Sequence, residues 1–286
     1  MLDFIEDGIR GMHVEATRTA FLEQFWHRRE EFWSWQTETF GTRFRQDCMP
    51  VFLHGGNPQD RVLIMGINPG FQGALDRRIE QVVQADVARY VSLHEQFFDD
   101  YPAFQSETGG RSPFWNNLRS KLATMLPDQV LPAEKWLAYR TTCAVQDIIP
   151  FRSTHQSTSA GDLRPGTPLG RIANATFEGL RFSDARSVWL FSKEGYKAIE
   201  GASKVLAFLS EPQVFSVAGC TRSGLHRSVE ALVVQLQREG GRPPLPLLAV
   251  DNALISQPAF PFGEVCCMRA TCTPRRTMAE QLRARL

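Results

Sequence analysis

Short apolar runs alternate along this chain with longer segments whose apolar residues recur at helical spacing. The runs end at glycine, proline or polar residues, which is typical of buried strands, and they lie at residues 62–65, 143–145, 187–191 and 214–217. Helices are predicted around these runs, over residues 15–45, 75–100, 113–125, 132–139 and 223–238, and from about 169 and 193. Turn-forming and polar residues predict loops at 101–112 and 153–168. Strands that alternate with helices indicate a parallel sheet covered on both faces.

The predicted architecture is one α/β domain, a three-layer α/β/α sandwich around a central, mainly parallel four-stranded sheet. Its core is expected to span about residues 50–240. Residues 1–49 read as a helical extension whose many aromatic side chains would pack against the main domain. Residues 75–112 read as an insertion, and residues 241–286 as a C-terminal extension.

The composition fits a globular protein with one large domain or two small ones. The chain has 286 residues, of which 43% are hydrophobic and 22% are charged, and this excludes a disordered or collagen-like chain. Lysine and arginine total 32 against 31 for aspartate and glutamate, so the net charge of +1 neither indicates nor excludes a nucleic-acid partner. Residues 268–286 carry five arginines and one acid, which fits either a solvated helix or a tail that contacts phosphates.

No apolar run approaches the ~18 residues that a membrane-spanning helix needs, and the first residues carry acids where a signal peptide needs bases. We therefore expect a cytoplasmic protein without a membrane partner. The six cysteines include no C-x-x-C pair, so a zinc ribbon or a cysteine-held iron–sulfur cluster is not expected. We predict reduced thiols, no metal and no cofactor.

Three loops are expected at the carboxyl ends of the predicted strands, where parallel sheets bind their ligands. They cover residues 66–73, 147–153 and 219–227. None contains the glycine-rich motif of dinucleotide enzymes, the P-loop of nucleotide triphosphatases or the G-x-S-x-G of common α/β hydrolases. These classes of enzyme are therefore disfavoured.

One of these loops carries Gly66-Ile67-Asn68-Pro69-Gly70 directly after a predicted strand. It resembles the first motif of the uracil-DNA glycosylase superfamily, in the form used by the mismatch-specific uracil and thymine-DNA glycosylase branch. Further segments resemble later motifs of that branch in the same order: Phe114-Trp115, Lys193-Glu194-Gly195-Tyr196 and Ser223-Gly224-Leu225-His226-Arg227. The resemblance covers about residues 50–240, and it implies a DNA partner, a flipped-out base and hydrolysis of the N-glycosidic bond without a cofactor.

The resemblance assigns roles within the first motif. Asn68 would hold the attacking water by hydrogen bonds, although its amide cannot accept a proton as a carboxylate does. Gly66 and Ile67 would line the base pocket. Gly70 would leave the pyrimidine 5-position open because it has no side chain, and Phe71 would stack on the base. Each residue also fits an ordinary turn or core role.

The resemblance also assigns roles in the last motif. Thr221 stands where relatives carry the residue beside the base O2, and His226 is a candidate substitute, so both would stabilise the leaving base. Leu225 would fill the hole left by the flipped base, with a buried position at the start of a helix as the alternative. Ser223 and Arg227 would contact the DNA backbone.

Asp147 is the main departure from the family pattern. Many relatives end the second strand with an asparagine that donates to uracil O4 and accepts from N3–H, and Asp147 takes that place here. An ionised carboxylate would be repelled by O4 but could accept from the N4 amino group of cytosine, and a protonated one could serve N3 too. A surface or helix-capping aspartate is the alternative. Arg152, which follows in the same loop, is a candidate phosphate contact.

The space that Gly70 would leave beside the pyrimidine 5-position and the carboxyl that Asp147 would present to the edge of the base together imply a cytosine with a 5-substituent. Because removal of plain cytosine would destroy the host's own genome, we expect a monofunctional glycosylase that excises modified cytosine from phage DNA, such as glucosylated hydroxymethylcytosine, and leaves an abasic site. The insertion at 75–112 could line the pocket for a large substituent. Two alternatives stay open: a repair glycosylase for uracil or thymine mispairs, and a non-catalytic nucleic-acid-binding domain.

Overall fold

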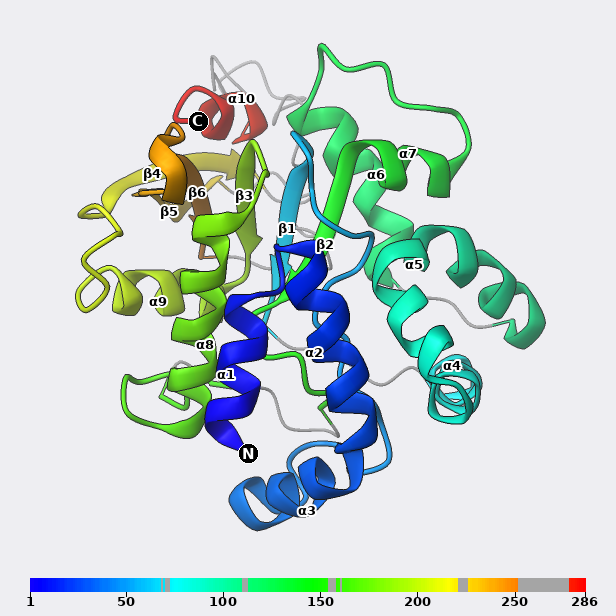
Figure 1. Ribbon diagram of the computed structural model, residues 1–286. Coiled ribbons are helices and arrows are strands. Elements are labelled where there is room, and N and C mark those ends of the chain that lie inside the picture. Colours follow the sequence, from blue (N-terminus) through cyan, green and yellow to red (C-terminus); the bar gives the residue numbers. More distant parts are fainter. Residues whose placement is uncertain are drawn as a thin grey trace.

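The computed structural model describes residues 1–67, 69, 73–109, 113–153, 158–159, 161–220, 226–251 and 278–286, with the backbone alone for residues 113, 116, 218–220, 226 and 227. Six strands in this part of the chain form one mixed sheet (Figure 1). They are β1 (Val62–Gly66), β2 (Cys143–Asp147), β3 (Ser187–Phe191), β4 (Gln213–Cys220), β5 (His226–Leu236) and β6 (Leu245–Val250).

The order of strands across the sheet is β2-β1-β3-β6-β5-β4. Strands β2, β1, β3 and β6 are parallel to one another, whereas β5 is antiparallel to both of its neighbours, β6 and β4. Strand β4 therefore runs in the same direction as the parallel strands. The carboxyl ends of five strands consequently lie at one edge of the sheet, which we call the carboxyl edge.

Helices cover both faces of this sheet. They are α1 (Leu2–Arg10), α2 (Glu15–His27), α3 (Arg29–Phe40), α4 (Ala74–Ala85), α5 (Val87–Thr108), α6 (Pro113–Met125), α7 (Lys135–Thr142), α8 (Pro168–Gly179), α9 (Lys193–Ala202) and α10 (Met278–Arg283), with short 3-10 turns at Leu180–Phe182 and Glu239–Gly241. Figure 1 shows α8 and α9 on one side of the sheet and α5, α6 and α7 on the other. An α/β architecture with helices on both faces was predicted and is confirmed.

The aromatic side chains near the N-terminus pack against the main domain, as the sequence predicted. The ring of Phe25 lies 5.3 Å from that of Phe52, which precedes β1, and the ring of Phe32 lies 5.3 Å from that of Phe151, which follows β2. All four side chains are buried. Helices α2 and α3 are therefore part of the hydrophobic core and not a detached extension.

The prediction of four mainly parallel strands was wrong, because the predicted helix at 223–238 is strand β5. Residues 228–230 alternate between exposed and buried, and residues 231–234 are fully buried between β4 and β6. A continuous apolar run of this kind fits a buried helix and a central strand equally well, and here the pairing with two neighbours decides for the strand.

The core also extends beyond residue 240, where it was expected to end. Strand β6 inserts between β3 and β5, with Trp189 opposite Leu248 on one side and Val233 opposite Leu248 on the other. Farther on, α10 buries Met278, Ala279 and Leu282. The arginine-rich C-terminus was expected to be a solvated helix or a tail that contacts phosphates. Its described part is a helix, but this helix is docked on the domain, where Arg283 donates a hydrogen bond to the Thr124 carbonyl.

The predicted loop at 101–112 is helical as far as Thr108. Pro102 has no N–H to donate, but the helix continues because its inner face buries Phe97, Phe98 and Tyr101. Gly109 then ends the helix in a left-handed conformation with φ of 64°. Helix α7 likewise starts and ends about three residues later than predicted.

Within the described ranges, none of the helices combines the length and the apolar character that a membrane span requires.

Candidate functional site at the carboxyl edge

Two of the loops predicted to form a site are joined by hydrogen bonds at the carboxyl edge. Gly66 at the end of β1 pairs with Asp147 at the end of β2. The pairing continues past the strands, because Ile149 N–H donates to the Ile67 carbonyl at 2.8 Å and Ser153 N–H donates to the Pro69 carbonyl at 3.0 Å. The loop after β1 is therefore held along the loop after β2, as the strand-end rule predicted.

The Asp147 carboxyl lies over Gly66. A Cβ built on Gly66 would stand 2.2 Å from Oδ1 of Asp147, so any side chain at position 66 would displace the carboxyl. Asp147 is partly buried, and burial raises the pKa of its carboxyl from 3.8 to about 7, although the positive charge of Arg152 acts in the opposite direction. Close to neutral pH this group is therefore present both as an acid and as a carboxylate.

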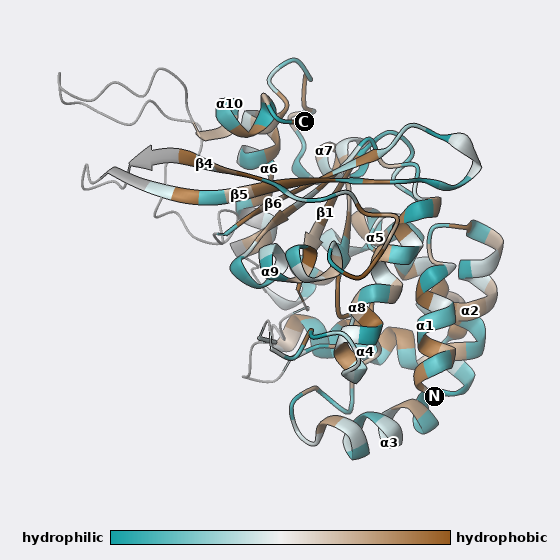
Figure 2. Cartoon of the chain, turned by 90° about the vertical axis from the view of Figure 1, so that its left-hand side faces the viewer, coloured by the Kyte–Doolittle hydropathy of each residue, from teal (hydrophilic) through white to brown (hydrophobic). Residues whose placement is uncertain are grey.

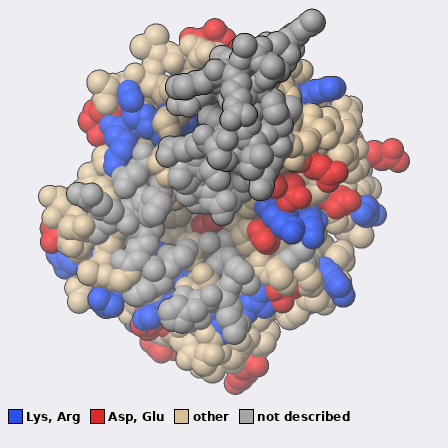
Figure 3. Space-filling view, turned by 180° about the vertical axis from the view of Figure 1, so that it is seen from behind, with Lys and Arg blue, Asp and Glu red and all other residues tan. Residues whose placement is uncertain are grey.

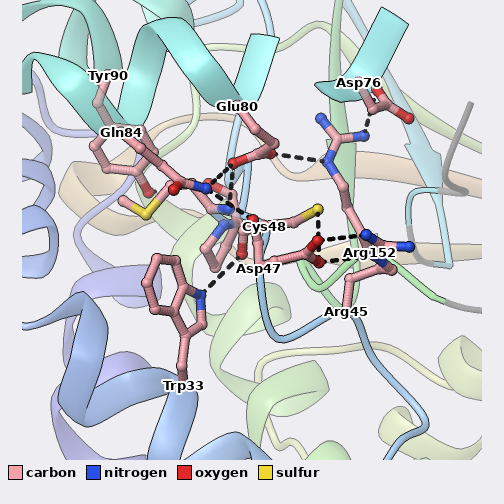
Figure 4. Close-up of polar contacts among 11 residues, drawn as sticks. Trp33, Arg45, Asp47, Cys48, Asp76, Glu80, Gln84, Tyr90 and Arg152 are labelled. Carbon is pink, nitrogen blue, oxygen red and sulfur yellow. Dashed lines mark hydrogen bonds and ion pairs between the residues drawn. The ribbon is translucent and has the colours of Figure 1, made fainter. Parts of the chain in front are cut away.

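Arg152 lies in a buried ion-pair cluster with two carboxylates of α4 (Figure 4). Its side chain is 7% exposed, its Nη1 lies 3.0 Å from Oδ1 of Asp76, and its Nε lies 3.5 Å from Oε1 of Glu80. The expectation that Arg152 contacts a DNA phosphate is therefore corrected, because the guanidinium faces the interior and is already neutralised there.

The cluster continues into the segment that precedes β1. Glu80 accepts hydrogen bonds from the Met49 N–H at 2.8 Å and from Nε2 of Gln84 at 3.0 Å. Burial nevertheless raises the pKa of Glu80, and it raises the pKa of the neighbouring Cys48 thiol to about 12. Figure 4 shows these side chains between α4 and the segment that contains Asp47 and Cys48. Two carboxylates thus face one guanidinium beside Asp147.

The third predicted loop, at 219–227, begins on β4 and ends on β5, which form a long antiparallel hairpin. Val250, the last residue of β6, pairs with Ala231, so residues 226–230 of β5 and 216–220 of β4 continue beyond β6. At about 3.3 Å per residue, the hairpin reaches roughly 16 Å past the end of β6. Figure 2 shows β4 and β5 extending beyond the rest of the sheet. Because β4 is parallel to β1, this end of the hairpin belongs to the carboxyl edge.

Several predicted site residues lie outside the described residues, and these are Asn68, Gly70, Phe71, Thr221, Ser223 and Leu225. The backbone of His226 and Arg227 belongs to β5, opposite Cys220 and Gly219. These two residues therefore start a strand and not a helix, so the predicted helical setting of the last motif was wrong. Their predicted roles stay predictions.

The other segments that carried the resemblance belong to helices α6 and α9. The Trp115 side chain is buried among aromatic rings of α5 and α7, including Phe97 and Trp136. Lys193 starts α9 directly after β3, and the Ser192 hydroxyl caps that helix by accepting from the Gly195 N–H at 2.9 Å.

Sequence reasoning missed three carboxylates near this edge. Asp76 and Glu80 lie four residues apart on α4, a spacing that places both on one helical face and could have suggested a shared partner. Asp251 follows β6, a strand that the sequence did not predict and that pairs with β3. Its Oδ1 is buried, with no hydrogen bond from the described residues.

Charges of both signs are interspersed on the surface. Figure 3 shows lysine and arginine side by side with aspartate and glutamate, and no continuous basic band crosses the coloured part of that face. Arg43 pairs with Asp162 at 2.5 Å, and Arg140 pairs with Asp99 at 2.6 Å. The coloured part of this face therefore shows no track of cations for a phosphate backbone.

Two further features concern ligands. A cavity of about 480 Å³ lies at the opposite edge of the sheet, between α6, α10 and the start of β3, and is lined by Met125, Trp189 and Arg283 among others. It is separate from the carboxyl edge. Among the described residues, no three histidine, cysteine, aspartate or glutamate side chains are grouped closely enough to hold a metal ion.

Comparison of the chain with protein-family models, with curated proteins and with solved structures gives no match in any of the three.

Proposed function

We propose that this protein is a monofunctional DNA glycosylase that flips out a 5-substituted cytosine, hydrolyses its N-glycosidic bond and leaves an abasic site. The observation that carries the proposal is the Asp147 carboxyl, which lies over the side-chain-free Gly66 at the carboxyl edge. This is the edge at which open α/β sheets bind their ligands. The described ends of two motif-like segments, Gly66 of β1 and the backbone of His226 and Arg227 in β5, belong to the same edge.

The chemistry of a carboxyl group supports cytosine as the base. Cytosine offers the N4 amino group as a donor and N3 as an acceptor. An ionised Asp147 accepts from N4, and a protonated Asp147 accepts from N4 and donates to N3 in one bidentate contact. Against uracil, the ionised form would face the O4 acceptor, and this repulsion disfavours uracil wherever the carboxyl is ionised.

The modification would supply the selectivity that protects the host genome. Gly70 leaves the 5-position open, and the 75–112 segment, which holds most of α4 and α5, would surround a large substituent. Glucosylated hydroxymethylcytosine of phage DNA has such a substituent, so we propose defence against phage as the setting. Asn68 would hold the water, with Thr221 and His226 at the leaving base.

The long β4–β5 hairpin supports a role in holding the duplex open. In this proposal Leu225, in the segment between β4 and β5, would fill the gap left by the flipped base, while Ser223 and Arg227 would contact the backbone. A hairpin that projects beyond the sheet can reach the DNA without a wide basic surface, which agrees with the interspersed charges on the coloured part of the face in Figure 3.

Base release measured by mass spectrometry tests the proposal. Purified protein is incubated with phage DNA that carries glucosylated hydroxymethylcytosine, with unmodified DNA and with a duplex that contains a U·G mispair, and Asn68→Ala serves as the control. We expect release of the modified cytosine alone, and its loss in the Asn68→Ala and Asp147→Asn variants. Release of uracil alone would make the protein a repair enzyme, and release of no base would favour a binding domain without catalysis.

A further inference from the structure

The Asp147 carboxyl has an unusual position for a charged group. It is partly buried at the end of β2, and no described residue donates a hydrogen bond to its oxygens. Gly66 contributes no side chain on the side where the carboxyl lies. Partial burial removes part of the water that would solvate the carboxylate, so this setting favours the neutral acid more than open solvent does.

The charges that face Asp147 do not reverse this preference. From the loop after β2 comes Arg152, whose charge is shared with Asp76 and Glu80 of α4. Tyr101 of α5 also lies near this cluster, and burial keeps its hydroxyl neutral by raising its pKa far above the ordinary value. The cluster thus contributes one cation against two carboxyl groups. The raised pKa of Asp147, about 7, agrees with this balance.

We infer that Asp147 is the acid that transfers a proton to N3 of the departing cytosine, an inference that rests on the proposed glycosylase function. The C1′–N1 bond breaks and its electron pair moves into the ring of the base, which makes N3 more basic. The proton of the Asp147 carboxyl then passes to N3, and cytosine leaves as a neutral molecule. Water forms the new bond to C1′ and releases a proton to solvent, from which Asp147 is protonated again.

This role explains why a reader of cytosine would be an acid and not an amide. An amide can make hydrogen bonds to the base, but it has no proton to give up at neutral pH. An acid whose pKa lies near the working pH combines a large protonated fraction with a useful driving force for the transfer. Asp147 would therefore contribute to the rate of bond cleavage, beyond recognition of the base.

The test is the pH dependence of single-turnover base release between pH 5.5 and 9. The substrate is a duplex oligonucleotide with one glucosylated 5-hydroxymethylcytosine. With a pKa of about 7, the protonated fraction falls from about nine-tenths at pH 6 to about one-tenth at pH 8, so the rate constant should fall about tenfold. Asp147→Asn should be slow and independent of pH in this range, whereas Asp7→Asn, an exposed carboxylate of α1, should keep the wild-type profile.

A second measurement needs no variant. A formyl group in place of the hydroxymethyl group withdraws electrons and makes cytosine a better leaving group. The ratio of the wild-type rates on 5-formylcytosine and on the hydroxymethylated base should grow at least tenfold between pH 6, where the acid assists departure, and pH 9, where it is ionised, because a difference in recognition of the two substituents does not change with the protonation of Asp147. The neighbouring Cys48 has a pKa of about 12 and does not titrate in this range.

The outcomes separate this inference from the proposed function. A rate that falls between pH 6 and pH 8, with a leaving-group effect that grows with pH, supports the transfer from Asp147. Release of modified cytosine at a rate that is constant or rises with pH keeps the glycosylase and overturns the acid. Release of no base by wild type at any pH overturns the proposed function, and the acid with it.

Discussion

Replacing Arg152 with methionine tests whether its guanidinium stabilises the fold or contacts DNA. The wild-type side chain is 7% exposed and pairs with Asp76 and Glu80, which are themselves buried. Methionine has a similar length and fills a similar volume, but it leaves two buried carboxyl groups without a cation. Removal of one partner from a buried ion pair typically costs about 3–5 kcal/mol.

A loss of this size is a large part of the roughly 5–15 kcal/mol that stabilises a typical domain. The loss should be greater at pH 8 than at pH 5, because burial raises the pKa of Glu80 and protonation of its carboxyl at low pH removes part of the uncompensated charge. Urea unfolding of wild type and Arg152→Met at both values measures the difference. The triple variant with Asp76→Asn and Glu80→Gln should recover much of the stability, since no buried charge is then left.

A contact with a phosphate predicts the opposite pattern. The free energy of unfolding of Arg152→Met would then lie within about 0.5 kcal/mol of the wild-type value, as is usual for a substitution at an exposed position. Its DNA binding would weaken, and the slope of log affinity against log salt concentration would fall by about one ion. That pair of results would refute the assignment of Arg152 to the interior.

Three further predictions concern the carboxyl edge. Because burial raises the pKa of Asp147 from 3.8 to about 7, ionisation of its carboxyl destabilises the folded state progressively up to about pH 7. The free energy of unfolding of Asp147→Asn relative to wild type should therefore grow by up to about 3 kcal/mol between pH 5 and pH 8 in urea titrations. A difference that stays constant with pH would contradict the raised pKa. Gly66→Ala places a Cβ 2.2 Å from Oδ1 of Asp147, so base release should fall about a hundredfold in single-turnover assays, and a rate equal to wild type would show that the position of this carboxyl is unimportant. Glu80→Gln removes one carboxylate that faces Arg152, so the midpoint of the pH–rate profile should move to lower pH, and an unchanged or higher midpoint would contradict the coupling.

Part of this fold could be predicted because the local sequence pattern is sufficient to identify some of the strands. The segments around residues 62–65, 143–145 and 187–191 are short apolar runs that end in turn or polar residues, and all three are strands. Residues 226–236 are apolar too, but only their pairing with β4 and β6 distinguishes a strand from a helix. The same holds for β6, whose neighbour β3 lies more than fifty residues earlier in the chain.

In the candidate site, too, some features could be predicted from the sequence and others depend on the tertiary structure. That Gly66 and Asp147 lie side by side could be predicted, because both end parallel strands and such ends meet at one edge. The burial of Arg152 could not, because its partners Asp76 and Glu80 belong to a helix that the sequence placed in an insertion. The sequence predicts an exposed cation for an arginine in a polar loop, and only the tertiary structure shows that two acidic side chains lie beside Arg152.

The place of β6 has a consequence for synthesis on the ribosome. The chain emerges from its N-terminus, so β1, β2, β3 and the β4–β5 hairpin leave the ribosome before residues 245–250 do. Until then, β3 and β5 each have an edge with unpaired backbone groups, and these edges can pair with another chain. We expect nascent chains that stall before residue 245 to aggregate, and the protein to depend on chaperones until β6 closes the sheet.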